Sequence, residues 1–392
     1  MIFICHSQKL LITYLCKKMR GKKMRTNEIL TVGFVSIFLA LSFFINCSKK
    51  KPIQPIQPTT YYLYALSMQD CCVYVIDTKT DLVVDTIFIE QHPYSYMQLG
   101  ISPDGLRLHI FTNNPYGFYE INTRTKQIEY KGPNSGTYVT PDGRLIVHPY
   151  GGIHFYDAAT HQLVHHDTLT LYPFAFDTNS PLVYGAVGLG KVAVFNYQTF
   201  SLVKTYEIVV RTPNPEEKPK PFFSAMILSP DSKTLYFTGG FPSSFGSFAL
   251  FGAYDLINDS LETFFPVRPE SEHTLFLVAY LAMSKDGKFV YITDPGGFIV
   301  GPPVPYGEIW VFDTQHKKFV SPITTDTIVP PGMGTPMSTC DIEITPDGKK
   351  VYVSNWAFTI LVIDPKMNDI IDTIGVVFGL SKFTELAIQT KP

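Results

Sequence analysis

The sequence predicts an all-β fold, a seven-bladed β-propeller made of four-stranded antiparallel blades. Three observations predict it: a turn of Pro-Asp-Gly character recurs, an apolar run closing on Asp or Asn recurs, and the segments between them are short and rich in Val, Ile, Tyr and Phe. A hairpin unit repeated at a regular interval is typical of repeat architectures. Short runs of this composition, bounded by turn residues, are typical of antiparallel strands.

The first repeated element is the turn. Its clear copies begin at Ser102, Thr140, Ser229, Ser284 and Thr345, and a degenerate copy covers residues 177–180. Proline presets φ and glycine accepts a positive φ, so each copy is suited to a tight hairpin between the first two strands of a blade.

The second repeated element is the apolar run. Its seven copies end at Asp77, Asn122, Asp157, Asn196, Asp255, Asp313 and Asp364. The unit that starts at Tyr61 lacks an opening strand, whereas residues 382–389 form an opening strand with no turn after them. We therefore expect the two ends of the domain to complete one blade together, which would leave no open sheet edge.

Many of these runs are continuously apolar, for example residues 235–237 and 289–292. A strand that is apolar on both faces belongs to a sheet that is covered on both sides. Blades arranged radially meet this condition, because each one is packed between two neighbours.

The best copy of the unit runs from Thr345 to Asp364 and continues with Ile370-Ile371-Asp372-Thr373-Ile374. With its Tyr352-Val353-Ser354-Asn355 core it resembles the YVTN-type repeat of prokaryotic envelope and surface-layer β-propellers, and the resemblance covers roughly the last 330 residues. It implies the fold and a binding or surface role, with lactonases and quinoprotein-like enzymes on related propellers. Residues 177–184 depart from the pattern, so the fourth unit has the least certain boundaries.

The N-terminal part predicts export. Basic residues precede an apolar stretch from Ile29 to Ile45, and Cys47 follows it, as in a bacterial lipoprotein signal. We interpret residues 1–47 as the export segment, with 1–23 a possible misassigned start before Met24, and 48–60 as a proline-rich tether. Residues 61–392 are the propeller. An uncleaved anchor and ordinary secretion remain alternatives, and all three place the domain outside the cytoplasm, in the cell envelope.

Composition and motifs exclude several functions. The net charge of −2 provides no field that would gather nucleic acid, so we expect no nucleic-acid partner, and we expect a monomer. The glycine-rich segment 185–191 runs into another strand rather than a helix, so it is not a phosphate loop. Two sets of residues, His148, His154 and Asp157 or the histidines at 161, 165 and 166, lack the spacing of a zinc site. We interpret these histidines as surface or packing residues and expect neither metal nor cofactor. A bond between Cys71 and Cys72 is disfavoured, because neighbours on a strand point to opposite faces. A disulfide from Cys340 to Cys71 or Cys72 stays open, with small buried thiols as the alternative.

Long connections predict the binding face. They cover residues 212–221, 239–248, 267–274, 294–307 and 329–338, all after the second or fourth strand of a unit. Insertions that collect on one face of a repeat protein usually mark its binding face. The candidate contact residues on that face are Tyr94, Phe222, Phe241, Phe245, Phe298 and Tyr306. Packing of these aromatic side chains onto the rim is the alternative.

The first residues of the inner strands should surround the mouth of the channel on that same face. Asp341 and Glu385 come from neighbouring inner strands, so they are the candidate catalytic pair if chemistry occurs there. Solvated channel carboxylates are the alternative. The sequence thus favours a membrane-tethered binding propeller for an extracytoplasmic protein, peptide or glycan; the alternative is a lactonase-like hydrolase or redox enzyme with its site at the channel mouth.

Overall fold

The computed structural model divides the chain into two units, Met1–Thr59 and Thr60–Pro392. The structure describes residues 60–67, 70–89, 97–113, 116–132, 136, 138–149, 151–210, 219–243, 246–264, 280–293, 308–320, 322–324, 339–355, 359–375 and 383–389. The predicted export segment and tether therefore lie outside the described residues, apart from Thr60. Within the described part, no helix is long and apolar enough to span a membrane.

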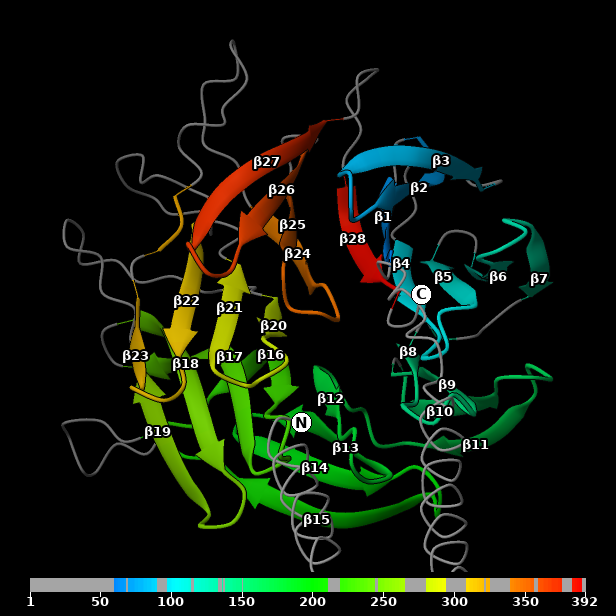
Figure 1. Cartoon of the computed structure of the whole chain (residues 1–392). Helices are drawn as coiled ribbons and strands as arrows, with labels where there is room; N and C mark the ends of the chain where they lie inside the picture. The colour runs from blue at the N-terminus through cyan, green and yellow to red at the C-terminus, as the bar shows by residue number, and fades with distance from the viewer. Residues whose placement is uncertain are drawn as a thin grey trace, which may run out of the picture. The chain divides into compact units, whose positions relative to one another are not determined.

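The second unit is a ring of seven four-stranded antiparallel sheets, as the sequence predicts (Figure 1). We number the blades along the chain and give their strands from the ring axis outwards. Blade one contains β28 (Phe383–Ile388), β1 (Tyr62–Ser67), β2 (Cys72–Asp77) and β3 (Leu82–Phe88). Blade two contains β4 (Met97–Ile101), β5 (Arg107–Asn113), β6 (Tyr116–Asn122) and β7 (Ile128–Gly132).

The next three blades follow the same order. Blade three contains β8 (Tyr138–Val139), β9 (Leu145–His148), β10 (Ile153–Asp157) and β11 (Leu163–Asp167). Blade four contains β12 (Phe174–Phe176), β13 (Leu182–Gly188), β14 (Lys191–Asn196) and β15 (Ser201–Glu207). Blade five contains β16 (Phe222–Leu228), β17 (Thr234–Ser243), β18 (Gly246–Asp255) and β19 (Ser260–Phe264).

The last two blades complete the ring. Blade six contains β20 (Leu281–Met283), β21 (Phe289–Thr293), β22 (Ile309–Asp313) and β23 (Lys318–Phe319). Blade seven contains β24 (Thr339–Ile344), β25 (Val351–Asn355), β26 (Thr359–Asp364) and β27 (Asp369–Gly375).

The ring closes as predicted, because β28 from the C-terminal end pairs with β1 from the N-terminal end (Figure 1). Leu386 lies opposite Ala65, and Ile388 lies opposite Leu63. Polar contacts then join blade one to blade seven: the Tyr352 hydroxyl donates to Asp81 Oδ1 at 2.7 Å, and Lys350 Nζ donates to the Thr78 carbonyl at 2.8 Å. Blade one is thus complete only when strands from both ends of the second unit are in place.

The two repeated turns form as their residue types dictate. Gly105, Gly143, Gly287 and Gly348 have φ between 70° and 73°, and Ser232 takes the same position in blade five at 57°. At the second turn the Asp or Asn side chain caps the backbone, as where Asp157 Oδ1 accepts from Thr160 N at 2.8 Å. In the degenerate copy, which lies in blade four, Asp177 Oδ1 accepts a hydrogen bond from Asn179 N at 2.8 Å. A local cap thus closes that turn without glycine.

Apolar side chains pack between the blades, as the continuous hydrophobic runs predict. Seven clusters of buried residues are present in the described part, one at each contact between neighbouring blades. We call each such contact a seam. The cluster at the seam between blades two and three is the smallest, with Phe118, Ile146 and Ala158 as its fully buried members.

Two local expectations need correction. Residues 239–248 are not a loop insertion, because β17 and β18 extend their ladder outwards until Ser243 lies opposite Gly246. Cys71 does not share a strand with Cys72; it lies in the turn before β2 with φ of 51°, so the argument from alternating strand faces does not apply. Cys72 carries a buried thiol, and the side chain of Cys340 lies outside the described residues.

Candidate functional site

The structure brings the two predicted carboxylates together. Asp341 lies on β24 and Glu385 on β28, the inner strands of blades seven and one, near the end of the ring from which the inner strands begin. The Leu386 N–H donates to Asp341 Oδ2 at 2.7 Å, and the Ile342 N–H donates to Asp341 Oδ1 at 2.8 Å. Asp341 therefore joins two neighbouring inner strands through its side chain.

A β-bulge in β24 gives Asp341 this orientation. Thr339 lies opposite Asn355 and Ile342 lies opposite Val353, so Cys340 and Asp341 together face the single residue Ser354. The Asp341 N–H, displaced from the regular ladder, donates to Ser354 Oγ at 2.9 Å. Bulges of this kind redirect side chains and are common next to functional sites.

A third carboxylate, Glu343, was missed in the sequence. It lies two residues after Asp341 on β24, so the two side chains share one face of the strand. Ile342 and Ile344 point the other way, into the cluster between blades six and seven. The alternation of acidic and apolar residues from 341 to 344 was the signal that could have revealed it.

The surroundings of the three carboxyls disfavour their charged forms. Burial raises the pKa of Asp341 to about 7, although its two backbone hydrogen bonds oppose this shift. Burial and then the neighbouring Asp341 raise the pKa of Glu343 well above its usual range. For Glu385, burial comes first among the causes that raise the pKa, followed by Asp341 and Glu343, while a hydrogen bond from Tyr280 opposes it.

We call Asp341, Glu343 and Glu385 the axial carboxyls. All three side chains remain partly accessible, and no ion pair in the described part of the chain involves them. Such groups can accept hydrogen bonds, donate them when protonated, exchange protons near neutral pH, or compensate a cation. Among the described residues, no group of three or more His, Cys, Asp or Glu side chains is placed to hold a metal ion.

The predicted aromatic contact residues differ in where the structure places them. Phe241 is only 6% exposed and belongs to the cluster between blades four and five, so its expected role as an exposed contact is wrong. The extended β17–β18 ladder places it inside the fold. Phe222 opens β16 and is partly accessible. The other predicted residues lie outside the described part of the chain: Tyr94, Phe245, Phe298, Tyr306 and the lipidation candidate Cys47.

A groove of about 660 Å³ lies on the opposite face of the ring, among the tight turns of blades two to four. Arg107, Arg144, Tyr197 and Phe200 are among the side chains that line it. Its carboxylates serve as turn caps; Asp142 Oδ1, for instance, accepts from Thr140 Oγ1 at 2.6 Å. Sequence reasoning missed this groove, because its lining comes from turns of three different blades.

Comparison with known proteins supports the fold. No family model matches the chain, and no curated protein matches it in sequence. Among solved structures, the dihydro-heme d1 dehydrogenase NirN in complex with DHE is similar with a TM-score of 0.54 and 12% identity, over 83% of this chain and 74% of that one. Kuenenia stuttgartiensis hydrazine synthase is similar with a TM-score of 0.56 and 13% identity, over 81% and 98%.

A third solved structure, that of U3-55K, has a TM-score of 0.54 and 12% identity, over 76% of this chain and 86% of that one. At such identities the likeness concerns the fold alone. The chain is a seven-bladed β-propeller. Because the names of these proteins point to different activities, the shared fold does not select between binding and catalysis.

Proposed function

We propose that this chain is a membrane-tethered binding propeller outside the cytoplasm, which presents one face to a protein or peptide partner. The observation that carries the proposal is topological. The connections 211–218, 265–279, 294–307 and 325–338 all follow the second or fourth strand of a blade, so they leave from the same end of the blades. The inner strands begin at that end, so the axial carboxyls lie near the same face.

The axial carboxyls indicate the chemistry of the partner. Burial, followed by the mutual proximity of these acidic groups, disfavours their anions and raises their pKa values, and no basic partner in the described structure offsets this. A lysine side chain or a peptide N-terminus would supply the missing positive charge. Binding of such a cation should release protons, so its affinity should increase as the pH rises through about 7.

The tether rests on the sequence alone. Cys47 follows an apolar stretch, and prolines recur every third residue from Pro52 to Pro58. Acylation of Cys47 would anchor the chain, and the extended segment would hold the propeller away from the membrane. Labelling of cells with a palmitate analogue should mark the chain, and Cys47→Ser should abolish that label.

Peptide binding to the purified full-length chain tests the proposal. The probes are matched peptides with one central Lys, Gln or Glu, together with a neutral oligosaccharide, and calorimetry measures their affinities. We expect the Lys peptide to bind most tightly, and Glu343→Gln to weaken it at least tenfold. Glu262→Gln serves as the control, because Glu262 is an exposed rim carboxylate that pairs with Lys317. Equal affinity for all probes would contradict the proposed chemistry.

An enzyme is the second candidate function, and one observation favours it. Asp341 has a pKa near 7, which suits a group that takes up and releases a proton during a reaction at neutral pH. Hydrolysis of a lactone panel by the same preparations discriminates the two functions. Turnover that Glu343→Gln and Asp341→Asn abolish, but Glu262→Gln does not, would identify a hydrolase. Binding without turnover supports the first proposal.

A further inference from the structure

Histidines gather at one seam of the ring. Within the described part of the chain, five of the seven histidines belong to the facing surfaces of blades two and three, while His165 packs on the far face of blade three and His316 lies on blade six. The five are His109, His148, His154, His161 and His166. The apolar cluster at this seam is also the smallest of the seven.

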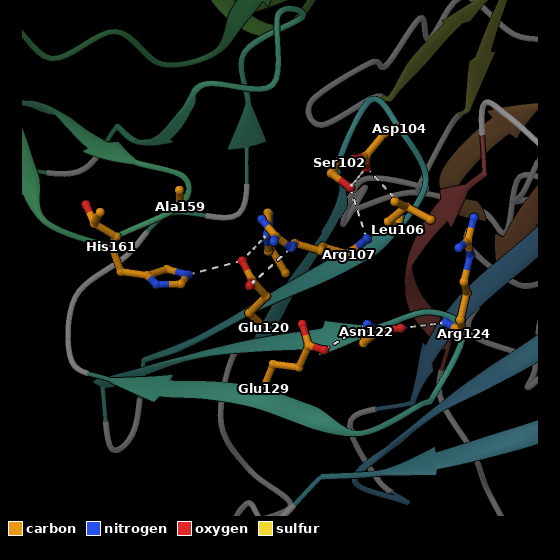
Figure 2. A network of polar contacts seen from close by, with 12 residues as sticks. Ser102, Asp104, Leu106, Arg107, Glu120, Asn122, Arg124, Glu129, Ala159 and His161 are labelled. Atoms are coloured by element: carbon orange, nitrogen blue, oxygen red, sulfur yellow. Dashed lines mark hydrogen bonds and ion pairs between the residues drawn. The ribbon is translucent and has the colours of Figure 1, made fainter.

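Glu120 is the centre of the first group (Figure 2). It lies on β6, is 3% exposed, and accepts hydrogen bonds from two histidine rings. His109 Nε2 reaches Glu120 Oε2 at 3.1 Å from the neighbouring β5, and His161 Nε2 reaches the same oxygen at 3.1 Å from blade three. Arg107 Nε lies 3.5 Å from Oε1 on the outer side.

His161 makes this group a link between blades. It has φ of 57° in the turn after β10, and its backbone N–H donates to the Asp157 carbonyl at 2.8 Å. Its ring stacks on Tyr130 of blade two, with centroids 3.9 Å apart and planes within 5°. One imidazole from blade three is thus packed between a tyrosine ring and a carboxylate of blade two.

The second group is a row of imidazoles across blade three. His154 lies opposite His148 on β9 and opposite His166 on β11, so the three side chains share one face of the sheet. The ring centroids of His154 and His166 are 4.3 Å apart, and those of His148 and His154 are 5.7 Å apart. His148 also contacts Phe111 of blade two at 5.0 Å. Charges on these rings would repel one another.

Protons are poorly accommodated at this seam while it is closed. The Nδ1 atom of His109 is buried without a hydrogen-bond partner, so a proton placed there would find no acceptor, whereas backbone hydrogen bonds to Gly152 and His148 only partly offset the burial of His154. Burial lowers the pKa of His109 even though Glu120 opposes the shift. Burial lowers the pKa of His148 to about 4, with His154 as a second cause, and burial followed by His166 lowers the pKa of His154.

The other charged groups at the seam do not cancel this effect. Glu120 already pairs with three cationic or titratable groups, and one of them, Arg107, brings a positive charge of its own. Asp157 caps its own turn with its carboxylate. Hydrogen bonds from Thr160 are the main cause that lowers its pKa, and His161 is the last of the causes. Tyr130 and Tyr156 complete the packing as neutral groups. An opened seam, with hydrated imidazoles, therefore binds protons more tightly than the closed one.

We propose that the seam between blades two and three is a proton-sensitive joint, which opens locally when the medium becomes mildly acidic. The direction follows from linkage. Histidines whose pKa is lower in the closed state stabilise it fully above about pH 6.5, and this contribution is lost as the pH falls towards 4. Because its apolar cluster has only three buried residues, this seam is stabilised least by apolar burial. It should therefore open before the other seams.

Hydrogen exchange of the full-length chain, read by mass spectrometry at pH 7.5 and pH 5.0, tests the joint. Labelling times are scaled for the intrinsic effect of pH. We expect peptides from β5–β6 and β9–β10 to lose at least tenfold in protection at pH 5.0, while peptides from β25–β26 in blade seven keep theirs. Equal loss in both regions, or no loss at the seam, would overturn the proposal without any variant.

Variants then identify the groups responsible. The double change His148→Phe and His154→Phe keeps aromatic volume but removes two titrating rings, so the acid-induced loss at the seam should shrink at least threefold. His316→Gln is the matched control, because that histidine is 68% exposed and pairs with Asp313 on blade six. An unchanged acid response in the double variant, with blade-seven protection at pH 7.5 equal to that of the parent, would refute the role of these rings.

Discussion

The two faces of blade two show how one pair of strands builds two different kinds of seam. Towards blade one, Leu108, Ile110, Tyr119 and Ile121 join a large apolar cluster. Towards blade three, the alternate residues of the same strands include Arg107, His109 and Glu120 beside Phe111 and Phe118. The first seam depends on apolar burial, which is independent of pH, whereas the second depends on groups that exchange protons. A propeller can thus make a single sector sensitive to its medium.

The largest expected effect is on the apolar face. Ile110 is fully buried, and Ile110→Ala should lower the free energy of unfolding by about 2–5 kcal/mol through lost burial and a cavity. Urea denaturation at pH 7.5 and pH 5.5 measures it. The loss in free energy of unfolding caused by Ile110→Ala should be the same at both pH values. A loss that depends markedly on pH would contradict the contrast between the two faces of blade two.

The polar face should respond less to a single change. Glu120→Gln leaves two imidazoles without a carboxylate, and each unsatisfied buried group costs ~1–3 kcal/mol, whereas the exposed Arg107 can be hydrated. We expect a loss of ~2 kcal/mol, together with faster exchange at the 157–162 turn, because His161 would lose its partner across the seam. A stable variant with a fully protected turn would show that the network contributes little.

The pH dependence of stability sharpens the comparison further. The contribution of His109, His148 and His154 to the free energy of unfolding should fall as the pH decreases from about 6.5 towards 4, because their pKa values are lower in the folded chain. The axial carboxyls, whose pKa values are raised, contribute with the opposite sign, so the test compares the parent with a variant at one of these histidines. The slope per proton taken up is ~1.4 kcal/mol per pH unit. Urea denaturation of the parent and of His148→Phe across this range should show that the variant gains free energy of unfolding relative to the parent as the pH falls. Parallel curves would contradict this assignment.

The smallest effect belongs to the rim. Lys126 of blade two forms an exposed ion pair with Asp85 of blade one, and a hydrogen bond from this lysine is the main cause that lowers the pKa of Asp85. Exposed pairs contribute ~0–1 kcal/mol and weaken with salt. Asp85→Asn should therefore change the midpoint of denaturation slightly at low salt and not at 1 M salt. A larger loss would mean that the rim holds the blades together.

The fold was predictable because its signals are local. Pro-Asp-Gly turns, Asp caps and apolar runs each act over a few residues, and their repetition gave the number of blades and the ring closure. Phe241 was wrongly predicted to be an exposed loop residue. The β17–β18 ladder is longer than the other hairpins, and the local composition does not reveal where a ladder ends.

The sites depend on register and on neighbouring blades, and local patterns encode these only in part, as the alternation from 341 to 344 does for Glu343. His161 meets Glu120 from 41 residues away, and Glu343 matters because it shares one face of β24 with Asp341, whose side chain accepts a hydrogen bond from β28. Asp341 and Glu385 could be anticipated, since inner strands of successive blades must adjoin. The proximity of His148, His154 and His166 could not be anticipated, because it requires the pairing of β9, β10 and β11 in one particular register.

The pairing of β28 with β1 also has a consequence for biosynthesis. About 300 residues separate Ser67 from Phe383, so β1 is made long before its partner emerges from the ribosome. Until then its edge is exposed to other chains, and aggregation competes with folding. Synthesis of β28 is therefore a checkpoint: a product that stops short of this strand keeps an unfinished blade, which proteases can recognise.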